Sequence, residues 1–233
     1  MAAGSVVVVG GTQGLGRELA KAYADDGRDV IVTGRNQARA DAAAKEIGGR
    51  TSGLGFDLAE PHTIGKHLED VGDVDHLVLA AIERDVNRVR EYDVDGAVRL
   101  VTLKLVGYTE VIHALTPRLG GESSILIFGG LARDRPYPGS TTVTTVNGGV
   151  TSLVRTLVIE LAPTRVNALH PAIVGDSPQW VDMAPERREA LVQRTPIGRL
   201  VTMAEVVEAS RFLLENQAIN GINLSVDGGW MCM

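Results

Sequence analysis

The feature that most constrains the fold is a glycine-rich turn near the start of the chain. Val6–Val9 is a β-branched apolar run too short for a helix, and glycines follow at positions 10, 11, 14 and 16. The next segment carries apolar residues at helical spacing: Leu15, Leu19, Ala22 and Tyr23. A turn without Cβ atoms lets a dinucleotide pyrophosphate approach the amides of a helix N-terminus, where the helix dipole favours negative charge. The sequence therefore predicts strand, turn and helix, and a second strand at 29–33 closes a βαβ unit.

Strand and helix patterns alternate along the rest of the chain without a linker. Further strands are predicted at 51–56, 74–80 and 124–128. Long helices are predicted over 95–115 and 143–161, where apolar residues recur every three or four positions. A capping box, Thr202–Glu205, predicts the start of the last helix. This alternation favours a single α/β domain over residues 1–233.

The charge balance and the cysteine and histidine usage narrow the class of protein. With 23 basic and 29 acidic residues, the formal net charge is −6, and Lys and Arg form no cluster, which argues against nucleic acid or an anionic membrane as partner. There is no basic segment followed by an apolar one at the N-terminus, and the single cysteine, Cys232, excludes an internal disulfide. The five histidines are dispersed, at 62, 67, 76, 113 and 170. We expect a cytoplasmic protein with no metal site.

The glycine pattern resembles that of the short-chain dehydrogenase/reductase family, which reads Thr-Gly-x-x-x-Gly-x-Gly. Gly10, Gly14 and Gly16 match it, and Val9 replaces the threonine. Residues 160–163 and 165–168 match the family's helix end and sixth strand, and 221–229 its seventh-strand ending. The resemblance covers residues 5 to 229. It implies a Rossmann fold with a doubly wound, seven-stranded parallel sheet, helices on both faces, and a small substrate lid at about 176–200, whose helix we predict to start at Ser177-Pro178.

The end of the second predicted strand indicates the type of dinucleotide. Gly34 lies near the position where a carboxylate would bind a ribose 2′-hydroxyl, and Arg35, suited to phosphate, follows it. We predict NADP(H), while a solvated arginine in a loop is the alternative. The resemblance implies cofactor contacts from Gly10, Thr12, Gln13, Gly14, Leu15, Gly16, Arg35, Asn36, Asp57, Leu58, Ala80, Ala81, Asn147, Pro171, Ile173 and Val174. Asp57 could instead cap the helix that begins near Pro61.

The family's catalytic residues are missing from this sequence. Its Asn-Ser-Tyr-Lys tetrad aligns with Lys104, Gly130, Val143 and Asn147. Changing the alignment does not restore the tyrosine and lysine of the tetrad, which are four residues apart. None of the tyrosines at 23, 92, 108 and 137 precedes a lysine by four residues, and no lysine follows Lys104. The family's Asn-Asn-Ala-Gly after the fourth strand is replaced by residues 79–82, Leu-Ala-Ala-Ile. Asn147 could still hydrogen-bond the nicotinamide ribose, but an amide supplies no positive charge.

Four side chains are candidates for the missing chemistry. Lys104 could polarise a carbonyl or organise water, especially if burial lowers its pKa, and Tyr137 could reach the nicotinamide from its loop. Arg133 or Arg135 could bind an anionic substrate group. The alternatives are a solvated helix lysine, a loop tyrosine packed against the lid, and a charged turn formed with Asp134.

These observations predict a divergent NADP(H)-dependent oxidoreductase. It would reduce a ketone of a small hydrophobic or cyclic substrate by hydride transfer, with atypical proton delivery. One alternative is a catalytically inactive dinucleotide-binding protein that senses redox state or serves as an assembly partner, and another is an isomerase or dehydratase on the same scaffold. By analogy with family tetramers, the helices containing 105–115 and 143–161 predict a homo-oligomer, a tetramer or dimer.

Overall fold

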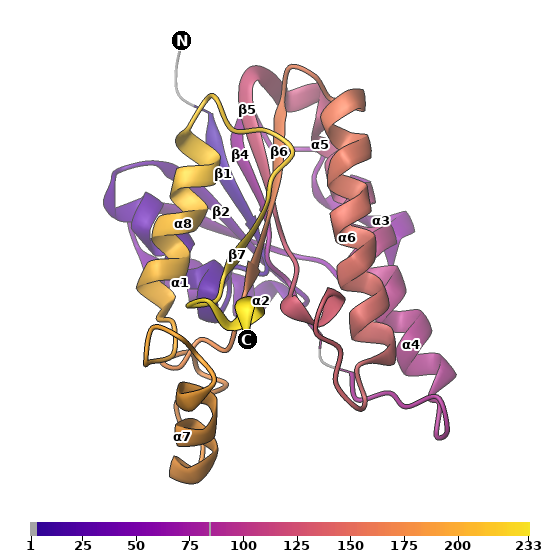
Figure 1. The fold of residues 1–233 in the computed structure, drawn as a ribbon. Helices are drawn as coiled ribbons and strands as arrows, with labels where there is room; N and C mark the ends of the chain where they lie inside the picture. The colour runs from indigo at the N-terminus through magenta and orange to yellow at the C-terminus, as the bar shows by residue number, and fades with distance from the viewer. Residues whose placement is uncertain (1–3, 84) are drawn as a thin grey trace.

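A seven-stranded parallel sheet forms the centre of the molecule (Figure 1). The computed structural model describes residues 4–83 and 85–233. The strand order is β3-β2-β1-β4-β5-β6-β7, with every neighbouring pair parallel. The strands are β1 (Ser5–Val9), β2 (Asp29–Gly34), β3 (Arg50–Gly55), β4 (Val74–Leu79), β5 (Leu119–Phe128), β6 (Arg165–Pro171) and β7 (Asn223–Val226). This order confirms the predicted doubly wound fold, in which ligands bind beyond the carboxyl ends of the strands where the order reverses, between β1 and β4.

Helices cover both faces of the sheet (Figure 1). One face carries α1 (Gly14–Asp25), α2 (Gln37–Ile47) and α8 (Met203–Glu215). The other carries α3 (Pro61–His67), α4 (Val94–Val101), α5 (Tyr108–Leu115) and α6 (Thr141–Glu160). Two hydrophobic cores result because successive strand residues point to opposite faces. In β1, Val7 and Val9 enter one core while Val6 and Val8 enter the other, and all four are at most 1% exposed.

The helix predicted over 95–115 is present and contains one irregular turn. α4 and α5 are separated by a π-helical turn at Thr102–Gly107. Gly107 lies at the end of this turn against the backbone carbonyl of Leu58, where a Cβ atom would collide with that oxygen. The predicted helix is confirmed over its whole length, and its irregular turn carries Lys104 toward the crevice side of the sheet. Single π-helical turns within α-helices often occur at functional sites.

The segment proposed as a lid begins differently from the prediction. Ser177 does not cap a helix, because its hydroxyl donates to the carbonyl of Val174 at 2.8 Å and closes a turn. The helix of this segment is α7 (Pro185–Gln193), which contains no buried residue and projects away from the sheet (Figure 1). The predicted capping box is confirmed, since Thr202 and Glu205 bond reciprocally at the start of α8.

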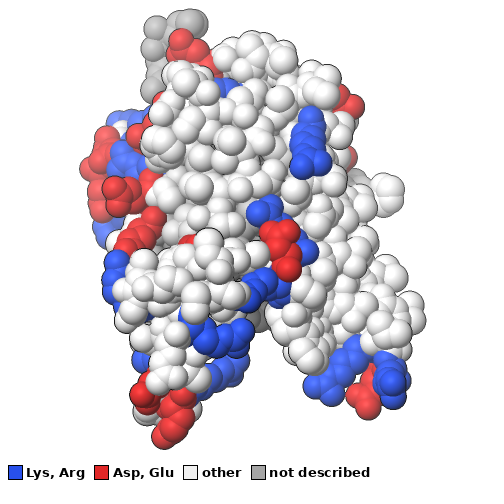
Figure 2. All heavy atoms as spheres, viewed as in Figure 1, with Lys and Arg blue, Asp and Glu red and all other residues white. Residues whose placement is uncertain are grey.

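The surface is mixed in charge and notched at one end. Figure 2 shows basic and acidic side chains interspersed on the visible face, and a hollow between the lobe that carries α7 and the lobe at the start of α4. Among the described residues, no helix has the length and apolar character needed to cross a membrane. Within the same residues, no group of three or more His, Cys, Asp or Glu could hold a metal ion.

Candidate functional site

The glycine turn between β1 and α1 is closely packed at Gly10 and Gly16 and open at Gly14. Gly10 and Gly14 have φ angles of +86° and +57°, a conformation that L side chains rarely adopt. A Cβ on Gly10 would lie 2.5 Å from the Cα of Ala81, and one on Gly16 would lie 2.5 Å from the carbonyl oxygen of Gly10. A Cβ on Gly14 would meet no atom within 4 Å.

The N-terminus of α1 has the properties of an anion site. Gln13, its N-cap residue, makes no capping hydrogen bond through its side chain, and the first turn contains no acidic residue. The first amides of a helix have no intrahelical partner, so they can donate to a negative group that lies over Gly14. The turn thus fits the pyrophosphate of a dinucleotide. Near it, Thr12 packs beside Gly34, where a Cβ would lie 2.7 Å from the Thr12 methyl group.

Ion pairs connect the loops at the far end of the crevice, where the adenosine half of a dinucleotide is expected. Arg35, after β2, donates from Nη1 to Oε1 of Glu83 at 2.8 Å. Arg99 of α4 donates to both oxygens of Glu83, from Nη2 and Nε, at 2.7 Å each. Its Nη2 also lies 3.0 Å from Oδ2 of Asp57. We call Arg35, Glu83, Arg99 and Asp57 the adenosine-end cluster.

Three of the predicted cofactor residues have partners within the chain. Arg35 is not a free cation, because Glu83 is its partner, although the arginine side chain is 61% exposed. Asp57 does not cap α3 but accepts from Arg99 and from the backbone amide of Ala59 at 2.9 Å. Asn36 accepts from the amide of Arg39 at 3.1 Å and caps α2. The hydrogen bonds that Arg99 donates to Glu83 and Asp57 raise the pKa of its guanidinium.

Lys104 lies in the interior near the end of β4. Its side chain is 3% exposed, and Nζ lies 3.1 Å from Oη of Tyr108 and 3.5 Å from the carbonyl oxygen of Ala81. Burial lowers the pKa of Lys104 from 10.5 to about 7. Tyr108 donates to the same Ala81 carbonyl at 2.6 Å, and burial raises the pKa of its phenol. The lysine predicted as a candidate is thus a buried amine that changes protonation near neutral pH.

The remaining tetrad positions carry no acid or base. Asn147 is buried on α6, and a Cβ on Gly130 would lie 2.9 Å from its Nδ2. The amide of Asn147 therefore occupies the space beside Gly130 that a serine side chain would need. Val143, one turn earlier on α6, is partly buried and apolar. The structure brings Gly130 and Asn147 together, as the alignment implied, but it places no proton donor between them.

Arg133 and Arg135 are engaged within the chain. Arg133 donates from Nη1 to Thr151 at 2.9 Å and approaches Nε2 of His170, also at 2.9 Å. His170 is fully buried, and burial lowers its pKa to about 4, so the ring is neutral at pH 7 and can accept this hydrogen bond. Arg135 donates to the backbone oxygens of Trp230, at 2.8 Å, and Met233. Both arginines thus fix the loop after β5 instead of presenting free guanidinium groups for an anionic substrate, and only the Arg133–Asp134 pair matches the predicted charged turn.

Tyr137 lies on the surface. Its side chain is 53% exposed, in the wall of an open depression of about 430 Å³. The depression is also lined by Arg88, Val89 and Arg90 from the loop after β4, and by Ser140 and Thr144 at the start of α6. Tyr137 is exposed whereas Lys104 is buried, so the two predicted catalytic candidates lie in different environments.

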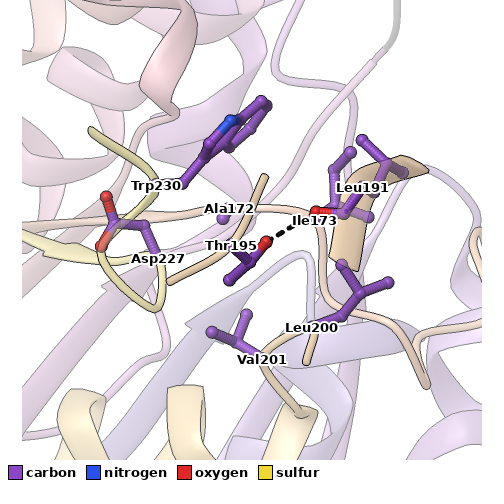
Figure 3. Close-up of a pocket in the computed structure, with 8 residues that line it drawn as sticks. All are labelled: Ala172, Ile173, Leu191, Thr195, Leu200, Val201, Asp227 and Trp230. Carbon is purple, nitrogen blue, oxygen red and sulfur yellow. Dashed lines mark hydrogen bonds between the residues drawn. The ribbon is translucent and has the colours of Figure 1, made fainter. Parts of the chain in front are cut away.

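The segment after β6 lies under the proposed lid (Figure 3). A crevice of about 10 Å³, room for a single water molecule, is bounded there by Ala172, Ile173, Leu191, Thr195, Leu200, Val201, Asp227 and Trp230. Leu191 and Thr195 belong to the lid, and the Thr195 hydroxyl donates to the Leu191 carbonyl at 2.8 Å. Two other predicted contact residues are chain neighbours of Ala172 and Ile173, namely Pro171 at the end of β6 and the buried Val174. The lid therefore packs against the segment that the family resemblance assigns to the nicotinamide.

Three residues of the site escaped the sequence interpretation. The pairing of Glu83 with Arg99 was not predicted, because it depends on the approach of two separate segments. Tyr108 was considered only as the first residue of a Tyr-x-x-x-Lys motif. The reverse spacing, Lys104-x-x-x-Tyr108, was a signal in the sequence, because residues four apart on a helix lie on the same face.

The comparisons with known proteins agree with this geometry. A family model described as enoyl-(acyl carrier protein) reductase matches residues 9–231. A 3-oxoacyl-[acyl-carrier-protein] reductase of Bos taurus is 31% identical over 231 residues, 95% of each chain. Carbonyl reductase family member 4 of Danio rerio is 31% identical over 232 residues, 96% of each chain.

A solved structure extends the similarity to the fold. It is a 3-ketoacyl-(acyl-carrier-protein) reductase from Brucella melitensis complexed with NADH, with a TM-score of 0.85, 28% identity and 98% of each chain covered. The sequence relatives, this structure and the β1–turn–α1 geometry lead to one assignment. The chain belongs to the short-chain dehydrogenase/reductase family.

Proposed function

We propose that this chain is an NADP(H)-dependent oxidoreductase that reduces a ketone of a small hydrophobic or cyclic substrate, with a proton source other than tyrosine. The observation that carries the proposal is the glycine turn, which keeps an open space over Gly14 and free amides at the start of α1. Relatives described as 3-oxoacyl and carbonyl reductases support the reaction class. Arg35 supports the choice of the phosphorylated nucleotide.

The magnitudes of the catalytic effects allow reduction without the tetrad. A general acid or base raises the reaction rate about 10²- to 10⁴-fold. Holding two reactants in position lowers the activation barrier by roughly 7 to 11 kcal/mol, and this is the larger of the two effects. When bound, the dinucleotide would supply the hydride. The residues of this chain that would orient it are the α1 amides, Arg35 and Asn147.

Lys104 is the side chain best suited to replace the missing acid. With a pKa of about 7, it exists as both ammonium and amine near neutral pH, so it can donate a proton without a large energetic cost. Tyr108 is a poor donor, because its phenol is fully buried and bonded to Ala81. Tyr137 is the second candidate, because it is exposed and belongs to the loop after β5.

The test is NADPH oxidation with a panel of cyclic and aliphatic ketones. We expect turnover by the wild-type protein, a lower kcat for Lys104→Ala, and no change for Lys66→Ala, which removes an exposed lysine of α3. Tyr137→Phe measures the second candidate. If kcat is unchanged in both the Lys104 and Tyr137 variants, neither residue donates the proton. If no ketone is reduced, the reductase assignment is wrong.

A dinucleotide-binding protein without catalysis is the second candidate function. The observation that favours it is the packing of Asn147 against Gly130, in a site where three of the four tetrad positions carry no acid or base. Calorimetric binding of NADPH together with no turnover of the ketone panel would support this function.

We also propose a homo-oligomer in the cytoplasm. Apolar side chains exposed on α4, the π-helical turn and α6 support the assembly, namely Val98, Val106 and Ile159, and light scattering tests it.

A further inference from the structure

The adenosine-end cluster brings four charged groups from four segments together. Arg35 follows β2, Asp57 follows β3, Glu83 lies in the loop after β4, and Arg99 lies on α4. Glu83 is at the centre, since its two oxygens accept from both guanidinium groups at 2.7 to 2.8 Å. Its side chain is 23% exposed, whereas that of Arg35 is 61% exposed. Glu83 is thus held in place from the inner side, while Arg35 is open to solvent.

The charges in this cluster cancel. Two guanidinium groups face two carboxylates, so the site offers no net positive charge to a phosphate group. A 2′-phosphate that bonds Arg35 would meet the Glu83 carboxylate on the same guanidinium. Like charges at such short distances repel each other, and the repulsion is strongest where the groups are partly buried. Arg35 therefore cannot give its full preference for a phosphorylated ribose while Glu83 remains bound to it.

We propose that Glu83 is a specificity-determining residue for the dinucleotide. It competes with the 2′-phosphate of NADP(H) for Arg35 and so holds down the preference for NADP(H) over NAD(H). Arg99 fixes the Glu83 carboxylate in the competing position by its two hydrogen bonds. This inference rests on the proposed dinucleotide binding. It means that Glu83, which lies outside both the glycine turn and the end of β2, controls which nucleotide is preferred.

The experiment compares the dissociation constants of NADPH, NADH, 2′,5′-ADP and 5′-AMP by calorimetry. In Glu83→Gln the neutral amide removes the repulsion, so we expect NADPH and 2′,5′-ADP to bind about tenfold more tightly. NADH and 5′-AMP lack the 2′-phosphate, and their affinities should change by much less. The matched control is Glu91→Gln, an exposed glutamate of the same loop that forms no ion pair with any described residue.

A second variant separates competition from a general loosening of the loop. In the double variant Glu83→Gln with Arg35→Gln, the gain for NADPH should disappear, because the cation for which phosphate competes is absent. A gain that persists there, an equal gain for NADH, or no gain in Glu83→Gln overturns the proposal. If neither wild type nor Glu83→Gln binds any of the four nucleotides, this proposal and the proposed function both fail. If the nucleotides respond as described but no ketone is reduced, the reductase activity alone fails.

Discussion

Replacing the buried lysine should stabilise the protein at neutral pH. Lys104 is 3% exposed and its pKa falls from 10.5 to about 7 on folding. Each pH unit between the two values corresponds to about 1.4 kcal/mol, so the burial of this amine costs about 5 kcal/mol at pH 7 and below. Lys104→Met removes the ionisable group and retains a flexible apolar chain of similar length. The hydrogen bond to Tyr108 would be lost, at about 1 kcal/mol, and Tyr108 would keep its bond to Ala81.

After these losses and small packing changes, we expect Lys104→Met to raise the free energy of unfolding by about 2 to 4 kcal/mol at pH 7. The gain depends on pH in a defined direction. Between pH 7 and 10.5 the unfolded chain binds a proton at Lys104 that the folded chain does not, so wild-type stability rises with pH across this window. The advantage of the variant should therefore shrink as the pH approaches 10.5.

The measurement is urea unfolding of both proteins at several pH values from 6 to about 10, with linear extrapolation. Lys66→Met is the matched control, because it removes an exposed positive charge and should alter stability by at most about 0.5 kcal/mol. A Lys104→Met protein that is less stable than wild type at pH 7, or an advantage that is constant with pH, would refute the reasoning. In that case the lysine would be charged and compensated in the folded protein.

Three further predictions test other parts of the structure. Gly14→Ala should weaken NADPH binding at least about tenfold, measured by calorimetry, because its Cβ enters the open space above the turn. Arg133→Met should lower the free energy of unfolding by about 1 to 3 kcal/mol in urea, since it leaves buried polar partners such as His170 without a donor. Restoring the tyrosine and lysine with Val143→Tyr and Asn147→Lys should raise kcat for an accepted ketone by about 10²- to 10⁴-fold, and an unchanged kcat would show that the substrate is not positioned there.

The sheet could be predicted from the sequence because its signals are local. The apolar run Val6–Val9 and the glycines after it define a strand and a turn by their own chemistry, and the structure has both where they were expected. The capping box at Thr202–Glu205 was predictable for the same reason. Each of these features depends on a few neighbouring residues, so distant segments do not alter it.

The features that were not predicted from the sequence depend on tertiary contacts. Arg35 was correctly placed at the end of β2, but its partner Glu83 comes from a loop 48 positions later in the chain. The π-helical turn at Thr102–Gly107 follows an ordinary amphipathic pattern and becomes irregular where Gly107 meets Leu58. Helix propensity and periodicity do not report on such a tertiary contact, so the pattern predicted the helix but not the π-helical turn inside it.

The π-helical turn also sets the orientation of the residues before it relative to the residues after it. Arg99 lies before it and faces Asp57, whereas Tyr108 lies after it and bonds to Ala81. Loss of one residue within the turn would rotate α4 against α5 by about 100°, the angle that one residue occupies in a helix. Such a deletion would displace Arg99 from its acidic partners while the second half of the helix stayed in the core. Relatives that differ in length at this turn should consequently differ in the arrangement of the end of the crevice where we propose that the adenosine binds, even where every side chain there is the same.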